Sequence, residues 1–338
     1  MSDFEYIKVS SLAKALEFSS KYAPDAKLLA GGVDLLLQIR QRAVNPLYLI
    51  DLKGIPDLNT ITYKDSSLSI GASASLRDIE KSEVILSRLP ALAEAAHQVA
   101  ARQIRNMATL GGNLCQSIKC PYYNQSHINL FMRQSIEPCF KRGGKVCHVK
   151  TWGKDACHAI LGTTYCLAPL ASDMAIVLAA LGGRLEVAGK GGSREVNVDD
   201  FYRKDGEPDI APDAILTRIE VSANGTGATA FLSCKAGTGA YSLVSVAVLL
   251  VLEDDKETCR DIKVRLGGVA PQPYEAKDVE EYVRGKRLNV EVSEKAAQLL
   301  FGKISLSDEA MMFKVSKARA LCREALIKSL ERGRGRLT

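Results

Sequence analysis

Hydrophobic and polar positions predict short helices and strands over the first 55 residues. Ser10 or Ser11 can cap a helix whose apolar residues recur on roughly one face, up to residue 22. Residues 27–30 then predict a short strand that runs into a double glycine, and residues 33–42 have helical spacing. A second short strand follows at 48–52. Residues 1–55 are therefore expected to form a compact α/β unit.

The same style of pattern continues after residue 56. Residues 68–72 predict a strand, Ser75 caps a short helix, and residues 91–101 form an alanine-rich helix. Residues 171–181 have helical spacing, with Ser172 as the cap and a double glycine at the end, before a strand at 184–187. This pattern predicts a second α/β unit.

Turn-forming residues separate this unit from the rest of the chain. Residues 221–230 have the Gly, Ser, Asn and Thr composition of a loop, which places a domain boundary near residue 225. Beyond it, residues 243–252 form a strongly apolar strand, and helical patterns occur at 276–284, 292–301 and 308–332. We expect a third, α+β domain over residues 226–338.

Composition and charge exclude several classes of protein. The chain is 46% hydrophobic and 25% charged, as in ordinary globular proteins. Its net charge of +6 is scattered, so no nucleic-acid partner is expected, and the basic cluster 332–336 is interpreted as a solvated tail. No basic segment precedes an apolar one at the N-terminus, and no apolar run reaches the roughly 20 residues of a membrane span. A cytoplasmic protein is expected.

Cysteines are concentrated in one segment. Six of the nine cysteines and three of the four histidines lie between residues 115 and 166. A reducing cytosol does not sustain structural disulfides, so thiols or metal ligands are expected. The six cysteines are Cys115, Cys120, Cys139, Cys147, Cys157 and Cys166, and the histidines are His127, His148 and His158.

Four of these cysteines are candidate metal ligands: Cys120, Cys139, Cys147 and Cys157. Their gaps of 19, 8 and 10 residues contain no close pair, which excludes a zinc ribbon. Zinc, an iron–sulfur cluster and merely buried or reactive thiols all remain open. His148 and His158 each follow a cysteine directly, so they can hydrogen-bond near such a site or ligate a metal.

The polar stretch around these cysteines carries Lys141, Arg142 and Lys145. These basic side chains either belong to a solvated loop or steer an acidic electron carrier toward the segment.

Two double glycines follow strand-like or turn-like segments, at residues 31–32 and 111–112. Without a Cβ atom, the backbone N–H groups of such bends can approach an anion closely, and a following helix adds partial positive charge. Together the bends could close on one diphosphate, although plain tight turns are the alternative. Neither bend is the G-x-G-x-x-G of a dinucleotide-binding domain or a phosphate-binding P-loop.

Four segments in order along the chain carry a family resemblance: LAGGVDL at 29–35, QIRNMATLGGN at 103–113, SDMAIVLAALGG at 172–183 and LGGVAPQP at 266–273. Together they resemble the FAD-binding medium subunit of the xanthine dehydrogenase family of molybdenum hydroxylases. The resemblance implies an α+β protein with a two-subdomain FAD-binding fold of the vanillyl-alcohol-oxidase type. It implies subdomains at 1–55 and 56–225, a cysteine-rich insert at about 115–165, and a C-terminal domain like that of carbon monoxide dehydrogenase flavoproteins at 226–338.

The resemblance also implies which residues hold FAD, and it implies no catalytic residue on this chain. Residues 27–35 would wrap the diphosphate and ribityl chain, the second bend would complete the cradle, and three further residues would lie near the ribityl or flavin. These residues are Lys27, Leu28, Leu29, Ala30, Gly31, Gly32, Val33, Asp34, Leu35, Thr109, Gly111, Gly112, Asn113, Asp173, Leu216 and Lys235.

The insert resembles that of the β subunit of 4-hydroxybenzoyl-CoA reductase. This implies a [4Fe–4S] cluster held by Cys120, Cys139, Cys147 and Cys157, with Cys115 and Cys166 as ordinary thiols. It implies an electron-transfer subunit between an external carrier, such as ferredoxin, and two partners: a large molybdenum-cofactor subunit and a small [2Fe–2S] subunit, in a dimer of heterotrimers. The alternative is the FAD subunit of an NAD-linked molybdenum hydroxylase with a zinc-bound or metal-free insert.

Overall fold

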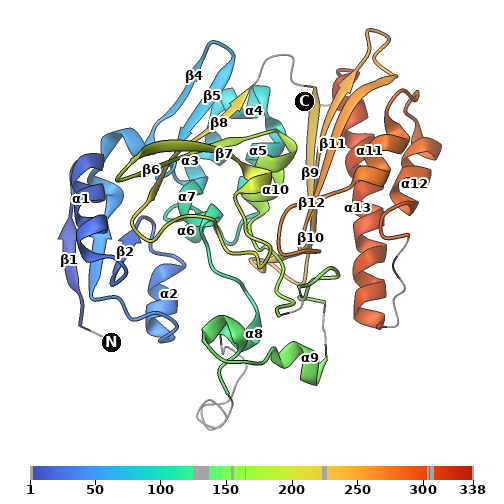
Figure 1. Ribbon diagram of the computed structural model, residues 1–338. Coiled ribbons are helices and arrows are strands. Elements are labelled where there is room, and N and C mark those ends of the chain that lie inside the picture. The colour runs from blue at the N-terminus through green and yellow to red at the C-terminus, as the bar shows by residue number, and fades with distance from the viewer. Residues whose placement is uncertain are drawn as a thin grey trace.

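The computed structural model describes residues 3–124, 137–153, 156–163, 165–222, 227–302, 304 and 308–336. Figure 1 shows three sheets, with helices packed between and beside them and with α8 and α9 at one end of the molecule. His127 and most of the residues between Cys120 and Cys139 lie outside the described ranges.

The first sheet is parallel, with the order β1-β3-β2. The side chain of Ser11 caps α1 by accepting a hydrogen bond from Lys14 N at 3.3 Å, as the sequence predicts. The elements are β1 (Glu5–Lys8), α1 (Leu12–Tyr22), β2 (Ala26–Leu29), α2 (Leu35–Arg40) and β3 (Tyr48–Asp51), followed by the short helices η1 (Leu52–Gly54) and η2 (Pro56–Asn59).

The second sheet is antiparallel and has the order β4-β5-β8-β6-β7. Its strands are β4 (Ile61–Lys64), β5 (Ser67–Gly71), β6 (Arg184–Gly189), β7 (Gly192–Asn197) and β8 (Ile215–Ser222). Its helices are α3 (Leu76–Lys81), α4 (Glu83–Arg88), α5 (Pro90–Gln98), α6 (Arg102–Arg105), α7 (Leu110–Leu114), α8 (Pro121–Asn124), η4 (Phe140–Arg142), α9 (His148–Trp152), α10 (Asp173–Ala180) and η5 (Val198–Asp200).

Helix α10 lies at the centre of the molecule (Figure 1), and all eight of its residues are buried. It contacts α5 on one side and β10 and β11 of the third sheet on another, which explains why it is apolar all round rather than amphipathic. Ser172 caps it by accepting a hydrogen bond from Ala175 N at 3.0 Å. The central helix therefore joins the second sheet layer to the C-terminal part of the chain.

The third sheet is antiparallel, with the order β12-β11-β10-β9, and three helices accompany it. Glu94 on α5 joins this layer to the second, because it accepts hydrogen bonds from Lys328 at 2.7 Å, from Arg332 at 2.6 Å and from Phe231 N at 3.1 Å. The elements are β9 (Ala228–Lys235), β10 (Ser242–Leu252), β11 (Cys259–Gly267), β12 (Tyr274–Glu275), α11 (Lys277–Val283), α12 (Val290–Gln298) and α13 (Glu309–Gly333).

Several sequence predictions need correction. Residues 221–222 end β8 and residues 228–230 begin β9, so the stretch 221–230 is not a continuous loop. The basic cluster at 332–336 is not a solvated tail: Arg332 binds Glu94, and Arg334 binds Glu257 at 3.2 Å. The helix predicted at 33–42 is present but shorter, as α2 (Leu35–Arg40), and Leu36 and Leu37 on it are 48% and 42% exposed. The domain limits at 55 and 225 stay predictions.

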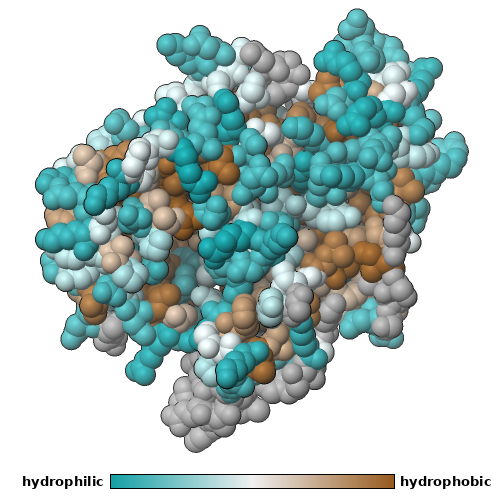
Figure 2. Space-filling model, viewed as in Figure 1, coloured by the Kyte–Doolittle hydropathy of each residue, from teal (hydrophilic) through white to brown (hydrophobic). Residues whose placement is uncertain are grey.

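Most of the visible face in Figure 2 is hydrophilic, with apolar patches set between polar side chains. Among the described residues, no helix is long and apolar enough to cross a membrane.

Candidate functional site

The two glycine bends meet. A Cβ atom on Gly31 would lie 1.9 Å from the carbonyl oxygen of Met107 and 3.2 Å from the Cα of Ala108, directly before the second bend. Backbone packs on backbone here, and only glycine allows this approach. The structure therefore brings together the two segments that the sequence singled out, although they are about 80 residues apart.

The first bend has open hydrogen-bond donors. Within the described part of the chain, no group accepts a hydrogen bond from the backbone N–H of Gly31, Gly32 or Val33. Gly32 has a φ of +73°, a left-handed conformation that glycine adopts without strain. Successive unpaired N–H groups in such a bend form a concave site for an anion, which fits a diphosphate.

The second bend is largely satisfied within the protein. Gly111 N donates to Ala72 O at 2.7 Å, and Gly112 N donates to Thr109 Oγ1 at 3.1 Å. The side-chain oxygen of Asn113 accepts a hydrogen bond from Ser172 Oγ at 2.6 Å. This bend therefore supplies a rigid wall, and the first bend supplies most of the free donors.

The carboxylate of Asp34 is occupied by hydrogen bonds and an ion pair within the protein. It accepts hydrogen bonds from Gln38 Nε2 at 2.7 Å and from Ser117 N at 2.9 Å, and it forms a partly buried ion pair with Lys119. These contacts tie the first bend to the segment that enters the cysteine-rich insert.

The loop before the second bend is held by Arg105 and Glu80. Arg105 donates to the carbonyls of Val99 and Ala100 at 3.1 Å and pairs with Glu80 at 3.0 Å. Burial alone raises the pKa of Glu80, but hydrogen bonds from His97, Arg77 and Arg105 outweigh it and bring the pKa to about 2. Glu80 is thus an ionised anchor for this loop.

Glu80→Gln should remove an acid-dependent part of the stability. The folded pKa of about 2 lies below the ordinary value of 4.5, so this contribution is full above pH 4.5 and is lost as the pH falls from about 4.5 toward 2. We expect Glu80→Gln to cost roughly 2 kcal/mol near neutral pH and to flatten the pH dependence in that window. Chemical denaturation from pH 2 to 7 measures both, and equal slopes for the two proteins would contradict the assignment.

The structure brings the buried Asp173 and the half-buried Lys235 near each other. Asp173 accepts a hydrogen bond from Ser242 Oγ at 2.7 Å, and burial raises its pKa. Lys235 donates to the carbonyl of Gln98, and burial lowers its pKa. Leu216 is buried in the core beneath the second sheet. Contact of these residues with a flavin stays a prediction.

Three of the four predicted cluster ligands line one small cavity, and a cysteine that the sequence analysis left out lines it with them. Cys120, Cys139 and Cys147 surround this cavity together with Cys166. Cys157 is not among its lining residues; its Sγ lies 4.0 Å from Nδ1 of His158, whose Nε2 lies 3.8 Å from the Sγ of Cys120. No sequence spacing points to Cys166, because it reaches the cavity through tertiary folding.

The loop between Cys139 and Cys147 closes tightly on itself. Phe140 N donates to Val146 O at 2.7 Å and Gly144 N donates to Cys139 O at 3.1 Å. A Cβ atom on Gly144 would lie 1.5 Å from Pro138 O, so the close approach needs glycine. This closure presents both sulfurs to the same cavity.

The cavity thiols receive backbone hydrogen bonds. Burial raises the pKa of Cys120 to about 12, against N–H groups of Tyr123 and Tyr122 that lower it. Burial likewise raises the pKa of Cys139 and of Cys166, whose Sγ accepts a hydrogen bond from Ala168 N at 3.4 Å. These groups are neutral thiols here, and a bound metal would displace their protons while keeping the N–H donors.

The insert is anchored to the body of the protein by its basic residues. Lys141 pairs with Asp205 and Glu207, both at 3.0 Å, and only 6% of its side chain is exposed. Arg142 donates to the carbonyls of Tyr123 at 2.8 Å and Arg42 at 3.1 Å. Neither side chain is a solvated loop residue or a free docking group, which corrects both interpretations made from the sequence.

Thiol sulfurs are the kind of ligand that soft metals prefer, but the thiols of this cavity do not lie at the distances needed to bind one metal ion. Among the residues that the structure describes, no group of three or more Cys, His, Asp or Glu side chains could hold a metal ion. The thiol cavity measures about 20 Å³, room for one water molecule. A four-iron cluster would fit only if the side chains that line the cavity moved apart. The ligand chemistry does agree with such a cluster, because buried thiols that receive N–H hydrogen bonds are typical of iron–sulfur sites.

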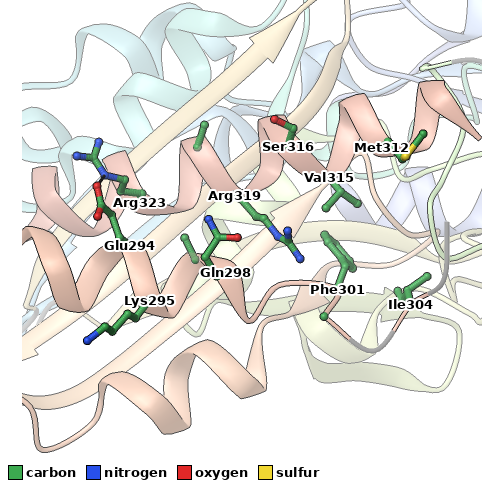
Figure 3. Close-up of a pocket in the computed structure, with 13 residues that line it drawn as sticks. Glu294, Lys295, Gln298, Phe301, Ile304, Met312, Val315, Ser316, Arg319 and Arg323 are labelled. Atoms are coloured by element: carbon green, nitrogen blue, oxygen red, sulfur yellow. Dashed lines mark hydrogen bonds and ion pairs between the residues drawn. The ribbon is translucent and has the colours of Figure 1, made fainter.

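A larger groove of about 920 Å³ lies between α12 and α13 and contains none of the candidate residues. Figure 3 shows Arg323 directed at Glu294 along its rim, and these side chains pair at 3.1 Å. Arg319 donates twice to Leu300 O, at 3.1 and 2.9 Å. The guanidinium groups of the two arginines that line this groove, Arg319 and Arg323, are thus already paired within the protein.

Comparisons with known proteins agree with the fold. Residues 2–223 match the FAD binding domain in molybdopterin dehydrogenase, and residues 229–330 match the CO dehydrogenase flavoprotein C-terminal domain. The aldehyde oxidoreductase FAD-binding subunit PaoB of Escherichia coli is 30% identical over 81% of this chain and 84% of its own length.

Two further relatives cover most of the chain. The glyceraldehyde dehydrogenase medium chain of Sulfolobus acidocaldarius is 27% identical over 85% of this chain and 83% of its own. A carbon monoxide dehydrogenase structure from Hydrogenophaga pseudoflava superposes with a TM-score of 0.75 at 25% identity, over 98% of both chains. The chain belongs to the family of FAD-binding medium subunits of molybdenum hydroxylases and carbon monoxide dehydrogenases.

Proposed function

We propose that this chain is an electron-transfer subunit that carries FAD and one [4Fe–4S] cluster within a molybdenum-cofactor oxidoreductase resembling 4-hydroxybenzoyl-CoA reductase. The observation that carries the proposal is the convergence of Cys120, Cys139 and Cys147 on one buried cavity, in the segment that follows the second bend. Its partners would be a large molybdenum subunit and a small [2Fe–2S] subunit, in a dimer of heterotrimers, and its location the cytoplasm.

Residues 27–35 would hold the FAD diphosphate and ribityl chain, with Gly31, Gly32 and Val33 as the main N–H donors. Thr109, Gly111, Gly112 and Asn113 would form the opposite wall, and Asp173, Leu216 and Lys235 would lie nearer the flavin ring. Bound flavin supplies the exchange between two-electron and one-electron transfer. The chain itself positions the cofactor, while substrate chemistry takes place on the molybdenum partner.

Cys120, Cys139, Cys147 and Cys157 would ligate the cluster, as the resemblance implies. The bound cluster carries single electrons, which suits a ferredoxin-like donor. The backbone N–H groups at Cys120 and Cys139 would stabilise their thiolates.

The alternative is the FAD subunit of an NAD-linked enzyme with a zinc-bound or metal-free insert. It is favoured by the lack of a metal-holding group in the described ranges of the chain and by the relatives' names, which include xanthine dehydrogenase FAD-binding subunits.

Iron analysis of the anaerobically purified complex separates these two functions. Two [2Fe–2S] clusters on the small subunit account for about four irons per heterotrimer, and a [4Fe–4S] cluster here raises the total to about eight. We expect about eight irons, matching acid-labile sulfide, and one FAD. A total of about four would refute the cluster, and a complex without flavin would refute the whole proposal.

A further inference from the structure

Lys119 lies where three parts of the chain meet, next to the first bend. Its ammonium group forms an ion pair with Asp34, which directly follows the open N–H groups of that bend. The same ammonium group lies 5.5 Å from the ring centroid of Tyr241, in the loop between β9 and β10. Only 9% of the Lys119 side chain is exposed. One enclosed cation therefore contacts both the first bend and a loop of the third sheet.

The ion pair is the strongest contact that Asp34 makes. Among the described residues, Lys119 is the one charged group that pairs with this carboxylate. The other donors are neutral: Gln38 Nε2 at 2.7 Å, Ser117 N at 2.9 Å and Ser117 Oγ at 3.1 Å. Hydrogen bonds between two charged groups are roughly twice as strong as neutral ones. The Asp34 side chain is 19% exposed, so water competes with the ion pair only in part.

Helix α2, which follows the bend, depends on such polar contacts. Ile39 is its one buried residue, so little apolar surface holds this short helix against the protein. Beyond its C-terminal end, Arg142 donates to the carbonyl of Arg42 at 3.1 Å, and within it Gln38 accepts a hydrogen bond from Tyr123 at 3.4 Å. The insert thus holds α2 at several points, and the ion pair is the point next to the bend.

We propose that Lys119 is a positioning residue for FAD: through Asp34, its ion pair holds the N–H groups of residues 31–33 in the orientation that receives the diphosphate. This inference rests on the proposed function, because it needs the FAD diphosphate at the first bend. A bend that is already ordered loses less conformational entropy when it binds a ligand, so a contact outside the cofactor can increase affinity. Without the ion pair, the bend should be looser and FAD should bind more weakly.

The inference is tested on the purified complex after reversible removal of its flavin. Hydrogen–deuterium exchange follows residues 31–33 without cofactor, and the quenching of FAD fluorescence measures the dissociation constant when flavin is returned. Lys119→Met should exchange faster at these residues and raise the dissociation constant about tenfold. Lys119→Arg, which keeps the positive charge, should recover most of the affinity. Lys145→Met is the matched control, because Lys145 is an exposed lysine of the insert that does not pair with Asp34, and it should leave both quantities unchanged.

The double variant of Asp34→Asn and Lys119→Met shows whether the two side chains act as a unit. If they act through their ion pair, the double variant should bind FAD no more weakly than the weaker single variant, whereas independent effects would add. If the Lys119→Met complex does not assemble, Asp34→Asn decides alone, because it removes the same ion pair. Faster exchange and weaker FAD binding in Asp34→Asn then support the inference, and wild-type values overturn it.

An unchanged exchange rate or an unchanged FAD affinity in an assembled Lys119→Met complex would overturn the inference. Additive effects in the double variant, or an equal loss of affinity in Lys145→Met, would overturn it as well. A wild-type complex that contains no flavin as purified would overturn the proposed function itself, and this is seen before any variant is made.

Discussion

Gly31→Ala is expected to abolish retention of FAD. The new Cβ atom would lie 1.9 Å from the carbonyl oxygen of Met107 and 2.8 Å from its carbonyl carbon, and neither backbone atom can rotate away. The two bends would have to separate, which moves the open N–H groups of the first bend relative to the wall formed by the second. Overpacking of this kind costs about 1–3 kcal/mol of stability, and losing even one charge-assisted hydrogen bond weakens binding by about tenfold or more.

The flavin-to-protein absorbance ratio after gel filtration, together with the melting temperature, measures this effect. Gly191→Ala is the matched control, because nothing lies within 4 Å of a Cβ atom there and its φ is not positive. It should keep wild-type flavin content. A Gly31→Ala protein that holds stoichiometric FAD would show that the contact between the bends does not shape the cofactor site.

Cys120→Ser is expected to remove the entire cluster. Cys120 is 8% exposed, lines the thiol cavity and contacts His158, so its side chain lies inside the protein at the proposed site. A serine hydroxyl is a hard and weakly acidic ligand that replaces a soft thiolate poorly. Iron should fall from about eight to about four atoms per heterotrimer, since the clusters of the small subunit are unaffected.

Three further cysteine variants make this result specific. Cys115→Ser, at an exposed position outside the cavity, should keep all the iron. If the resemblance assigns the fourth ligand correctly, Cys157→Ser should lose the cluster and Cys166→Ser should keep it. If only Cys166→Ser loses the cluster, Cys166 is the fourth ligand instead. Full iron in Cys120→Ser would contradict a cluster in this segment altogether.

Local chemistry was sufficient to predict the parts of the fold that depend on neighbouring residues. Ser11, Ser75 and Ser172 each cap a helix, and each accepts a hydrogen bond from an N–H three residues ahead. A cap is decided within one helical turn, so the sequence reveals it. The strand β9 was partly missed for the opposite reason. Its first residues look like a loop, and pairing with β10, such as Ala230 with Val248, makes them a strand.

The candidate site shows the same division. The glycine bends are visible in the sequence, but their contact through Gly31 and Met107 is not. Lys141 looked like a solvated charge until the fold placed Asp205 and Glu207 beside it, 64 and 66 residues later. Cys166 and the link from Lys314 to His158 likewise depend on long-range packing, which no local spacing encodes.

Iron-edge anomalous diffraction from crystals of the anaerobically purified complex tests the central claim most directly. We expect flavin density along residues 30–33 and 109–113, and one compact four-iron peak bonded to the sulfurs of Cys120, Cys139 and Cys147. An iron-free thiol segment, or a flavin bound away from the two bends, would contradict the account.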